Sequence, residues 1–207
     1  MEKQTVIIDL GVANYGSMIN MLKRVGASPK LSSDPDDIVA ADYLVLPGVG
    51  AFDAVVSALR ARPDIMEAID TAVFKKKTPF MGVCVGMQLL FEGSEEGNLP
   101  GLGWFEGTLK KFNFPDNKSL RVPHMGWNKV RVAKNNPLLS QEDEHKFYFV
   151  HSYFVKETSN QDILTSTTYG TDFISAVNKD NIFGFQFHPE KSHKYGIQLF
   201  KNFVGLR

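Results

Sequence analysis

The sequence predicts an α/β protein: a doubly wound, mostly parallel sheet with a β-rich C-terminal half. Two observations support this fold class. Before Gly101, short apolar runs alternate with stretches of helical periodicity, and such runs are typical of parallel strands that helices cover on both faces. After Gly101, short β-rich runs follow one another, separated by Gly, Asn and Asp, as expected for hairpins and mixed sheet.

The part before Gly101 is predicted to contain buried strands and the helices between them. Apolar side chains recur at helical spacing between Met18 and Val25, and Gly26 ends this helix. A longer helical pattern is interrupted by Pro63, which cannot continue a helix. The expected strands therefore cover 6–10, 43–46 and 80–83, and the expected helical stretch covers 55–74.

The part after Gly101 is predicted to be rich in short strands and to end in an amphipathic helix. The strands are expected over 104–112, 128–132, 147–150, 164–168, 174–177 and 182–187, and the helix over 195–204. The sequence contains no internal repeat, low-complexity tract or linker. Because 207 residues suffice for one sizeable domain but are few for two, residues 1–207 are predicted to form a single domain.

The composition is that of a soluble globular protein, with 43% hydrophobic and 22% charged residues. Lys and Arg together number 23, as do Asp and Glu, so no net charge attracts nucleic acid or an anionic membrane. The single cysteine cannot form an internal disulfide, and a reactive thiol suits a reducing compartment. No segment resembles a signal peptide, and no apolar run reaches about 18 residues. We therefore expect a cytoplasmic protein.

The single cysteine, Cys84, lies where a predicted strand meets a predicted helix, in the pattern Gly-x-Cys-x-Gly. This arrangement is the thiol counterpart of the strand–turn–helix elbow that presents a nucleophile in hydrolases. Gly82 and Gly86 allow the strained turn, and the N-terminal N–H groups of the following helix favour a thiolate. The pattern alone equally fits a buried structural cysteine beside two packing glycines.

A histidine and a carboxylate follow the last predicted strand, in Phe187-His188-Pro189-Glu190. In an extended chain, residues two apart such as His188 and Glu190 face the same side and are spaced roughly 6.6 Å along the strand axis. Pro189 holds His188 out of the helical region. A nucleophilic cysteine needs an imidazole to carry protons and a third group to orient it. Cys84, His188 and Glu190 supply these groups, and all follow strands whose carboxyl ends meet at one sheet edge.

Several segments resemble a known family. They are Gly-x-Cys-x-Gly-Met-Gln at 82–88, Phe-His-Pro-Glu at 187–190 and Pro-Gly-Val-Gly at 47–50. Together they resemble the class I (triad) glutamine amidotransferases, which have a flavodoxin-like fold. Val-Pro-His-Met-Gly-Trp-Asn at 122–128 and Tyr-Phe-Val-His-Ser-Tyr at 148–153 further resemble the glutaminase subunits of imidazole glycerol phosphate synthase, a histidine-pathway enzyme. The resemblance extends from about Ile7 to Phe203.

The resemblance implies hydrolysis of the glutamine side-chain amide to glutamate and ammonia. Cys84 would be the nucleophile, His188 the proton carrier and Glu190 the group that orients His188. A cysteine peptidase or γ-glutamyl hydrolase on a similar scaffold is an alternative, against which the Met-Gly-Trp-Asn and His-Ser-Tyr segments argue. A non-catalytic binding domain is another, against which the intact triad argues.

The resemblance also implies an oxyanion hole for the tetrahedral intermediates. One donor is the backbone N–H of Val85, the residue after the nucleophile. By resemblance, the second is a backbone N–H at Val49 or Gly50, in the loop 48–50. A flip of a peptide in this loop would point that N–H inward. A plain tight turn after a strand is the alternative for this loop.

The glutamine pocket is implied by the same resemblance. Gln88 lies one helical turn after the nucleophile, so it can face the same cleft, and Glu96 matches the position that holds the substrate ammonium. Glu95 is the rival by register, and a solvated loop carboxylate is the other alternative. Backbone groups of Gly50, Ser152 and Tyr153 complete the pocket. His124 and His151 are expected to be structural. No zinc-ligand spacing, dinucleotide fingerprint or P-loop occurs, so we predict no metal and no nucleotide cofactor.

A partner is expected because ammonia released into water is protonated and lost. The resemblance implies a heterodimer with a barrel-shaped cyclase subunit that receives the ammonia, through the interface positions Asn14, Trp127, Tyr148 and Lys201. The loop 9–15 departs from the family pattern at Leu10, Ala13 and Tyr15. This departure leaves open a paralogous glutaminase that supplies ammonia for sugar amidation in surface-polysaccharide biosynthesis.

Overall fold

The computed structural model describes residues 3–115, 117 and 119–206, and it confirms the α/β fold class. In chain order the elements are β1 (Gln4–Ile8), α1 (Tyr15–Arg24), β2 (Ser28–Ser32), α2 (Pro35–Ala40), β3 (Tyr43–Gly48), α3 (Phe52–Arg60), α4 (Pro63–Asp70), a π-helical turn (Thr71–Lys75), β4 (Phe80–Cys84), α5 (Val85–Gln88), β5 (Gly93–Ser94), β6 (Thr108–Lys111), β7 (His124–Val132), β8 (His145–His151), β9 (Tyr153–Val155), a 3₁₀ turn (Asn160–Asp162), β10 (Ile163–Tyr169), β11 (Thr171–Lys179), β12 (Ile182–Phe185), a second 3₁₀ turn (Pro189–Lys191) and α6 (His193–Phe203).

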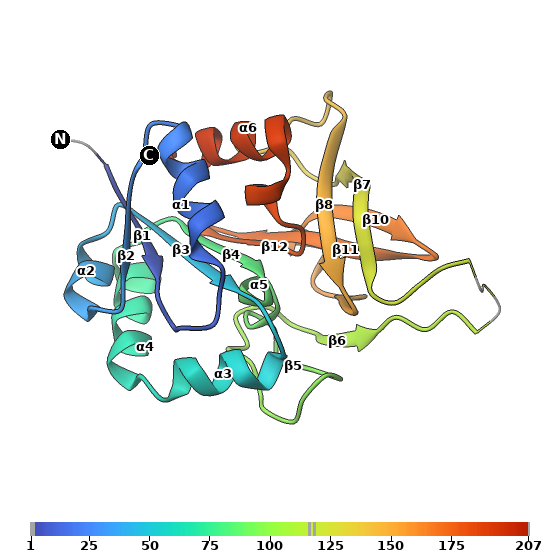
Figure 1. Cartoon of the computed structure of the whole chain (residues 1–207), viewed down its shortest axis with the longest axis horizontal. Helices are drawn as coiled ribbons and strands as arrows, with labels where there is room; N and C mark the ends of the chain where they lie inside the picture. Colours follow the sequence, from blue (N-terminus) through green and yellow to red (C-terminus); the bar gives the residue numbers. More distant parts are fainter. Residues whose placement is uncertain (1–2, 116, 118, 207) are drawn as a thin grey trace.

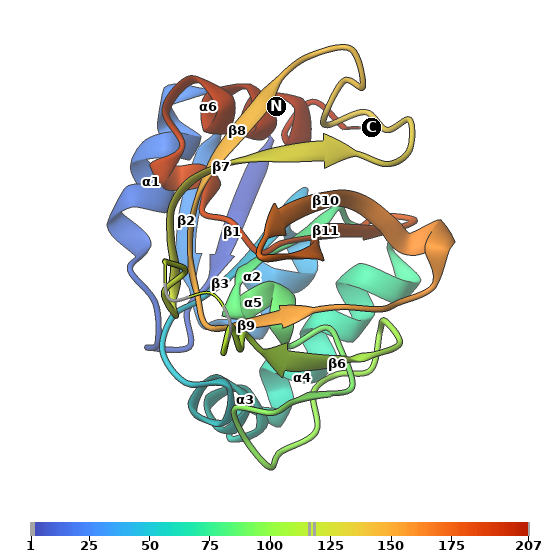
Figure 2. The ribbon, with the colours of Figure 1, turned by 90° about the vertical axis from the view of Figure 1, so that its right-hand side faces the viewer.

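The strands in the described part of the chain form one twelve-stranded sheet with the main order β2-β1-β3-β4-β12-β11-β10-β7-β8. Strands β2, β1, β3, β4 and β12 pair in parallel, and the others on this path pair antiparallel. Helices α1 and α6 cover one side of the parallel part and α3 and α4 the other (Figure 1). This arrangement is the predicted doubly wound sheet. Seen from the β-rich end, β6 and β9 run side by side (Figure 2).

The predicted buried strands are confirmed, with small shifts at their ends. Every residue of β3 and β4 is buried, as expected for central parallel strands. The helical stretch over 55–74 is two helices, because α3 ends at Arg60 and Pro63 begins α4. Proline suits the first turn of a helix, where its missing N–H would have no partner in the helix.

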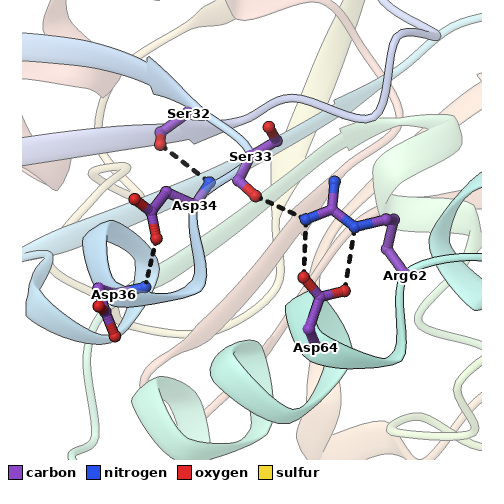
Figure 3. Close-up of polar contacts among 6 residues, drawn as sticks. All are labelled: Ser32, Ser33, Asp34, Asp36, Arg62 and Asp64. Atoms are coloured by element: carbon purple, nitrogen blue, oxygen red, sulfur yellow. Dashed lines mark hydrogen bonds and ion pairs between the residues drawn. The ribbon is translucent and has the colours of Figure 1, made fainter.

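Two N-terminal elements, β2 and α2, were not predicted. Strand β2 lies at the sheet edge and contains Pro29, so it has no buried apolar run and reads as a loop. Helix α2 is short, but its start carries a signal: Asp34 accepts a hydrogen bond from the N–H of Asp36, and Pro35 is the first helical residue (Figure 3). Beside it, the half-exposed Arg62 pairs with Asp64 and donates to the carbonyl of Ser33.

In the β-rich half the structure corrects three predicted strand boundaries. The run over 104–112 contains a strand only at Thr108–Lys111, because Gly107 has a φ of +108°, which other residues rarely adopt. Strand β7 begins at His124, so the Met-Gly-Trp-Asn segment lies within it. Strand β12 ends at Phe185, and the chain then crosses to β8, where the N–H of His188 donates to the carbonyl of Tyr148 at 2.8 Å.

The glycines around Cys84 allow α5 to pack directly against the sheet. A Cβ at Gly86 would collide with the carbonyl oxygen of Leu46 on β3. A Cβ at Gly82 would lie 2.5 Å from the carbonyl oxygen of Gly86. Both obstacles are backbone atoms, which cannot rotate away. These two glycines therefore allow α5 to lie close to β3 and β4.

We expect Gly86→Ala to lower the free energy of unfolding by about 3 kcal/mol or more, because the added methyl forces the backbone of α5 and β3 apart. Urea denaturation measures this loss. Gly93→Ala is the matched control, since a Cβ at Gly93 meets no atom within 4 Å. Equal stability of the two variants would contradict the packing role assigned to Gly86.

Candidate active site

The residues predicted to carry the chemistry meet at the carboxyl edge of the parallel strands. Gly48 ends β3, and its register partner Cys84 ends the neighbouring strand β4. Strand β12 pairs with β4 on the other side, and His188 follows it by three residues. Adjacent parallel strands end at a common edge, where ligands of open α/β sheets bind. In Figure 1 the tip of β4 leads directly into α5 at this edge.

Cys84 has the strained conformation expected for an elbow. Its φ is +56° and its ψ is −114°, a combination that non-glycine residues rarely adopt. The residue is only 6% exposed, but it lines a cavity of about 330 Å³ together with His188. The sulfur is therefore buried without being sealed into the core.

His188 and Glu190 form a buried ion pair, with 2.7 Å between Nδ1 of His188 and Oε1 of Glu190. The prediction that the backbone stays extended from His188 to Glu190 was wrong. The backbone is extended at His188 but turns into a 3₁₀ helix at Pro189, and this turn brings the carboxylate against the ring. Ser192 supports the turn by donating its hydroxyl to the carbonyl of His188 at 2.6 Å.

The electrostatics of this group favour a charged imidazole. Burial opposes the charge on His188, but the adjacent Cys84 and the hydrogen bond to Glu190 outweigh it and raise the pKa of His188 above its ordinary value. Because Nδ1 faces Glu190, Nε2 is the ring nitrogen left for the sulfur. Within the described residues Nε2 has no well-aligned hydrogen-bond partner, so it is available for proton transfer.

The cavity beside Cys84 and His188 gathers most of the other predicted site residues. Its wall consists of Val49, Gly50, Cys84, Val85, Gln88, Glu96, Pro123, Val150, His151, Ser152, Tyr153, His188 and Lys191. Glu190 instead borders an adjacent small hollow of about 20 Å³, together with Asn14. The carboxylate thus lies behind the imidazole rather than in the cavity.

The structure distinguishes Glu96 from Glu95. Glu96 lines the cavity and accepts a hydrogen bond from the N–H of Phe52 at 2.9 Å. Glu95 points elsewhere: it accepts from the N–H of Lys111 at 2.8 Å and pairs with the ammonium of Lys110 at 3.1 Å. Of these two residues, Glu96 is therefore the one that presents a carboxylate to the cavity.

The two predicted oxyanion donors differ in their availability. Val85 is the first residue of α5, so its N–H has no partner within the helix. The N–H of Val49 instead donates to the carbonyl of Val12 at 3.0 Å. Gly50, which follows, has a φ of +100°, and this freedom allows the loop to change conformation.

The four residues predicted to contact a partner lie on different elements. Trp127 and Tyr148 are register partners on β7 and β8. Their rings are arranged edge to face, with 6.4 Å between the ring centroids. Asn14 borders the hollow beside Glu190. Lys201 is exposed on α6, eight residues and about 12 Å of helix rise beyond His193, whose ring stacks on Trp127.

Sequence reasoning missed two polar residues at this site: Lys191, which lines the cavity, and Gln186. Gln186 is fully buried and connects Gln88 with Cys84: Gln88 Nε2 donates to its Oε1 at 3.0 Å, and its Nε2 donates to the sulfur at 3.9 Å. A lone glutamine in the apolar run 182–187 was the available signal, because a buried polar side chain needs partners.

His124 and His151, expected to be structural, form a buried pair behind the cavity. His151 Nδ1 donates to the carbonyl of Tyr153 at 2.8 Å, so its Nε2 accepts from Nδ1 of His124 at 3.0 Å. Burial lowers the pKa of His124 to about 4 and that of His151 to about 3. Both rings are therefore neutral at physiological pH, and they brace the wall that contains Tyr153.

We expect this pair to make the protein less stable as the pH falls from about 6.5 to 4. The folded pKa values lie below the unfolded value, so the unfolded state binds more protons in this window, and stability is highest above it. For His124 the expected loss at pH 5 is about 2 kcal/mol. Urea denaturation at pH 7 and pH 5 measures it, and His124→Gln should reduce the difference. His193→Asn, at an exposed histidine, should not; an unchanged difference in His124→Gln would contradict the assignment.

No metal centre or membrane-spanning helix is found in the part of the chain that the structure describes. Among those residues, no three His, Cys, Asp or Glu side chains are grouped so that they could hold a metal ion. No described helix is long and apolar enough to cross a bilayer.

Fold and site together define a class: an α/β protein with a strained thiol beside a histidine–carboxylate pair at the carboxyl edge of a parallel sheet. A family model described as "Glutamine amidotransferase class-I" matches residues 6–205. The chain therefore belongs to the class I glutamine amidotransferase family, a family of enzymes.

Several curated relatives and solved structures resemble the chain over nearly its whole length. "Imidazole glycerol phosphate synthase subunit HisH 2" of Pseudomonas aeruginosa is 52% identical over 97% of this chain and 98% of that protein. "Imidazole glycerol phosphate synthase subunit HisH" of Leptospira borgpetersenii is 42% identical over the same shares. The solved "PurLQS from Thermotoga maritima" has a TM-score of 0.77 at 18% identity, with 99% of both chains covered, and supports the fold.

Proposed function

We propose that this chain is the glutaminase subunit of an imidazole glycerol phosphate synthase, which hydrolyses glutamine and passes the ammonia to a cyclase subunit. One observation carries the chemistry: Cys84 and the His188–Glu190 pair converge on a cavity that is also lined by Gln88 and Glu96. Relatives that are 42–52% identical over almost the whole chain and bear the subunit's name support the pathway.

In the proposed reaction, the Cys84 thiolate attacks the side-chain amide carbon of glutamine and forms a C–S bond, while the carbonyl becomes an oxyanion. Protonated His188 donates its proton to the nitrogen as the C–N bond breaks, which releases ammonia and leaves a thioester. Neutral His188 then takes a proton from water, whose oxygen attacks the thioester. The C–S bond breaks, glutamate leaves and the thiolate returns. Glu190 keeps Nε2 of His188 directed at these atoms.

The oxyanion donors are proposed to be the N–H groups of Val85 and of Val49 or Gly50. For Val49 to contribute, its bond to the Val12 carbonyl must break and the peptide must turn towards Cys84. One such donor typically contributes about 10²–10³-fold to the rate. A partner that favours the turned loop would therefore switch the enzyme on.

Glutamine is proposed to bind with its ammonium at Glu96 and its reacting amide at Cys84. Gln88 and the backbone groups of Gly50, Ser152 and Tyr153 would hold the remaining polar atoms, since all of them line the cavity. Such a site contacts glutamine at both ends, and a glutamine residue inside a peptide chain would lack the free ammonium that Glu96 is proposed to bind.

The cyclase is proposed to form a cytoplasmic heterodimer with this chain and to cover the cavity. Large apolar side chains are exposed along this side: Val49, Val122, Met125 and Trp127. Val49 lines the cavity, and Met125 is the register partner of Val150, which also lines it. Asn14, Tyr148 and Lys201 are the further proposed contacts. Burying such a surface is a typical role of a partner subunit.

A second candidate is a paralogous glutaminase for sugar amidation in surface-polysaccharide biosynthesis. The departures at Leu10, Ala13 and Tyr15 favour it, because they change the loop next to Val12. Tyr15 has a direct role there: its hydroxyl accepts a hydrogen bond from the N–H of Leu10 at 3.1 Å. In addition, two of the similar relatives carry the number 2 in the name of the subunit.

The experiment that separates these candidates is a glutaminase assay of this chain alone, with the cyclase and its nucleotide substrate, and with a sugar-amidating synthase. We expect the cyclase to raise glutamine turnover by about 10²-fold or more, the contribution of one oxyanion donor. Stimulation by the sugar synthase alone would support the second candidate. Turnover that neither partner changes would contradict both.

A further inference from the structure

Gln186 is a buried polar side chain to which the proposed reaction gives no role. It lies two residues before His188, and none of it is exposed to solvent. Both ends of its side chain have partners: Oε1 accepts from Gln88 Nε2 at 3.0 Å, and Nε2 donates to the sulfur of Cys84 at 3.9 Å. Gln186 therefore connects the pocket residue Gln88 with the proposed nucleophile.

The backbone of β9 determines the direction of these hydrogen bonds. The carbonyl oxygen of Tyr153 can only accept, and Gln88 Nε2 lies 3.5 Å from it. The amide of Gln88 must therefore turn its NH₂ group towards Tyr153 and Gln186. Gln186 in turn must present its oxygen to Gln88, which leaves its own NH₂ group facing Cys84. The orientation of both amides thus follows from the network itself.

An N–H donor at the sulfur favours the thiolate over the thiol, because a hydrogen bond to the charged form stabilises that form. The effect is stronger in a buried site such as this one, where Gln88, Cys84 and Gln186 are at most 6% exposed. The 3.9 Å separation is long, and contacts of this kind shorten when the sulfur becomes charged and substrate binds.

We propose that Gln186 is a further catalytic residue, whose side-chain amide donates to the Cys84 thiolate and fixes the orientation of Gln88 in the glutamine pocket. This role rests on the proposed glutaminase function. It also assigns the substrate-facing atom of Gln88: since its NH₂ group is occupied, its Oε1 is left to accept a hydrogen bond from glutamine.

The test is the pH profile of Cys84 alkylation by iodoacetamide, which labels one site because the chain has a single cysteine. Gln186→Met keeps the length of the side chain but removes the donor. We expect the midpoint of its profile to rise by about one pH unit. At pH values below both midpoints the thiolate fraction then falls about tenfold, while the nucleophilicity of the thiolate rises about threefold.

The two profiles should therefore cross: the variant reacts about threefold more slowly below both midpoints and about threefold faster above both. A merely structural role would change access to the sulfur and shift the rate in one direction at every pH. Superimposable or parallel profiles would overturn the proposal. Gln198→Met, at an exposed position on α6, is the matched control and should leave the profile unchanged.

Two further measurements separate the parts of the proposal. Gln88→Met keeps the Gln186 donor and should raise the KM for glutamine with a smaller shift of the alkylation midpoint than Gln186→Met causes. If Gln186→Met does not fold, the wild-type protein decides: the ¹⁵N resonance of the Gln186 side-chain amide should titrate with Cys84 and stop doing so in Cys84→Ala. Absence of that titration would refute the contact. Neither alkylation nor NMR requires glutaminase activity, so failure of the proposed function would be seen separately.

Discussion

Replacement of Cys84 by alanine should abolish glutamine hydrolysis, with a loss of about 10⁴-fold or more. The reason is that the thioester pathway has no other nucleophile: the chain contains one cysteine, and it lies at the cavity with His188. The measurement is glutamate release by the complex with its synthase partner. Synthesis from added ammonium should continue at the wild-type rate in the same complex, because ammonia then bypasses this chain.

The ammonia-dependent rate is the internal control for Cys84→Ala, since it shows that the partner remains bound and active. Cys84→Ser should behave in the same way, because a hydroxyl is a far weaker nucleophile than a thiolate at neutral pH. Glutamine-dependent turnover that survives in Cys84→Ala would mean that the nucleophile has been assigned wrongly.

His188→Ala should reduce glutamine turnover by about 10⁶-fold, and Glu190→Gln by about 10⁴-fold. The imidazole transfers protons in both steps, whereas the carboxylate only orients it through the 2.7 Å contact to Nδ1. In Glu190→Gln the amide can still accept at that position, so part of the orientation survives. Values of kcat for the two variants in the complex measure the difference.

Glu190→Gln should also change how the stability of the protein depends on pH. The carboxylate helps to raise the pKa of His188, so its replacement by a neutral amide should lower that pKa towards the ordinary histidine value. A histidine pKa raised by folding stabilises the protein fully below the unfolded value, and this stabilisation is lost as the pH rises through the folded value. The variant should therefore lose more stability at pH 6 than at alkaline pH.

Equal losses of activity in His188→Ala and Glu190→Gln would show that Glu190 does more than orient His188.

Much of the fold could be predicted because buried parallel strands appear in the sequence as uninterrupted apolar runs. Strands β3 and β4 fall where the runs before Pro47 and Cys84 placed them. Strand β2 could not be found in this way, because an edge strand with a proline at position 29 buries little apolar surface. Propensity is weak where a strand contributes mainly backbone hydrogen bonds.

The site was predictable as a set of residues but not as a geometry. The spacing of His188 and Glu190 indicated a pair, yet its 2.7 Å contact depends on a 3₁₀ turn that local periodicity does not reveal. The choice between Glu95 and Glu96 depended on Lys110 and Lys111, which lie 15 and 16 residues after Glu95 on another strand. Long-range pairing of that kind cannot be read from neighbours in the sequence. The catalytic and binding roles of these residues stay predictions.

The most direct test of the central claim is mass spectrometry of the protein after treatment with 6-diazo-5-oxo-L-norleucine, an electrophile that resembles glutamine. If the cavity binds glutamine beside an activated thiol, one adduct should form on Cys84, and excess glutamine should slow its formation. His188→Ala should form the adduct far more slowly. No adduct, or an adduct on Cys84 that glutamine does not slow, would contradict the claim that this cavity brings a glutamine amide to the thiol.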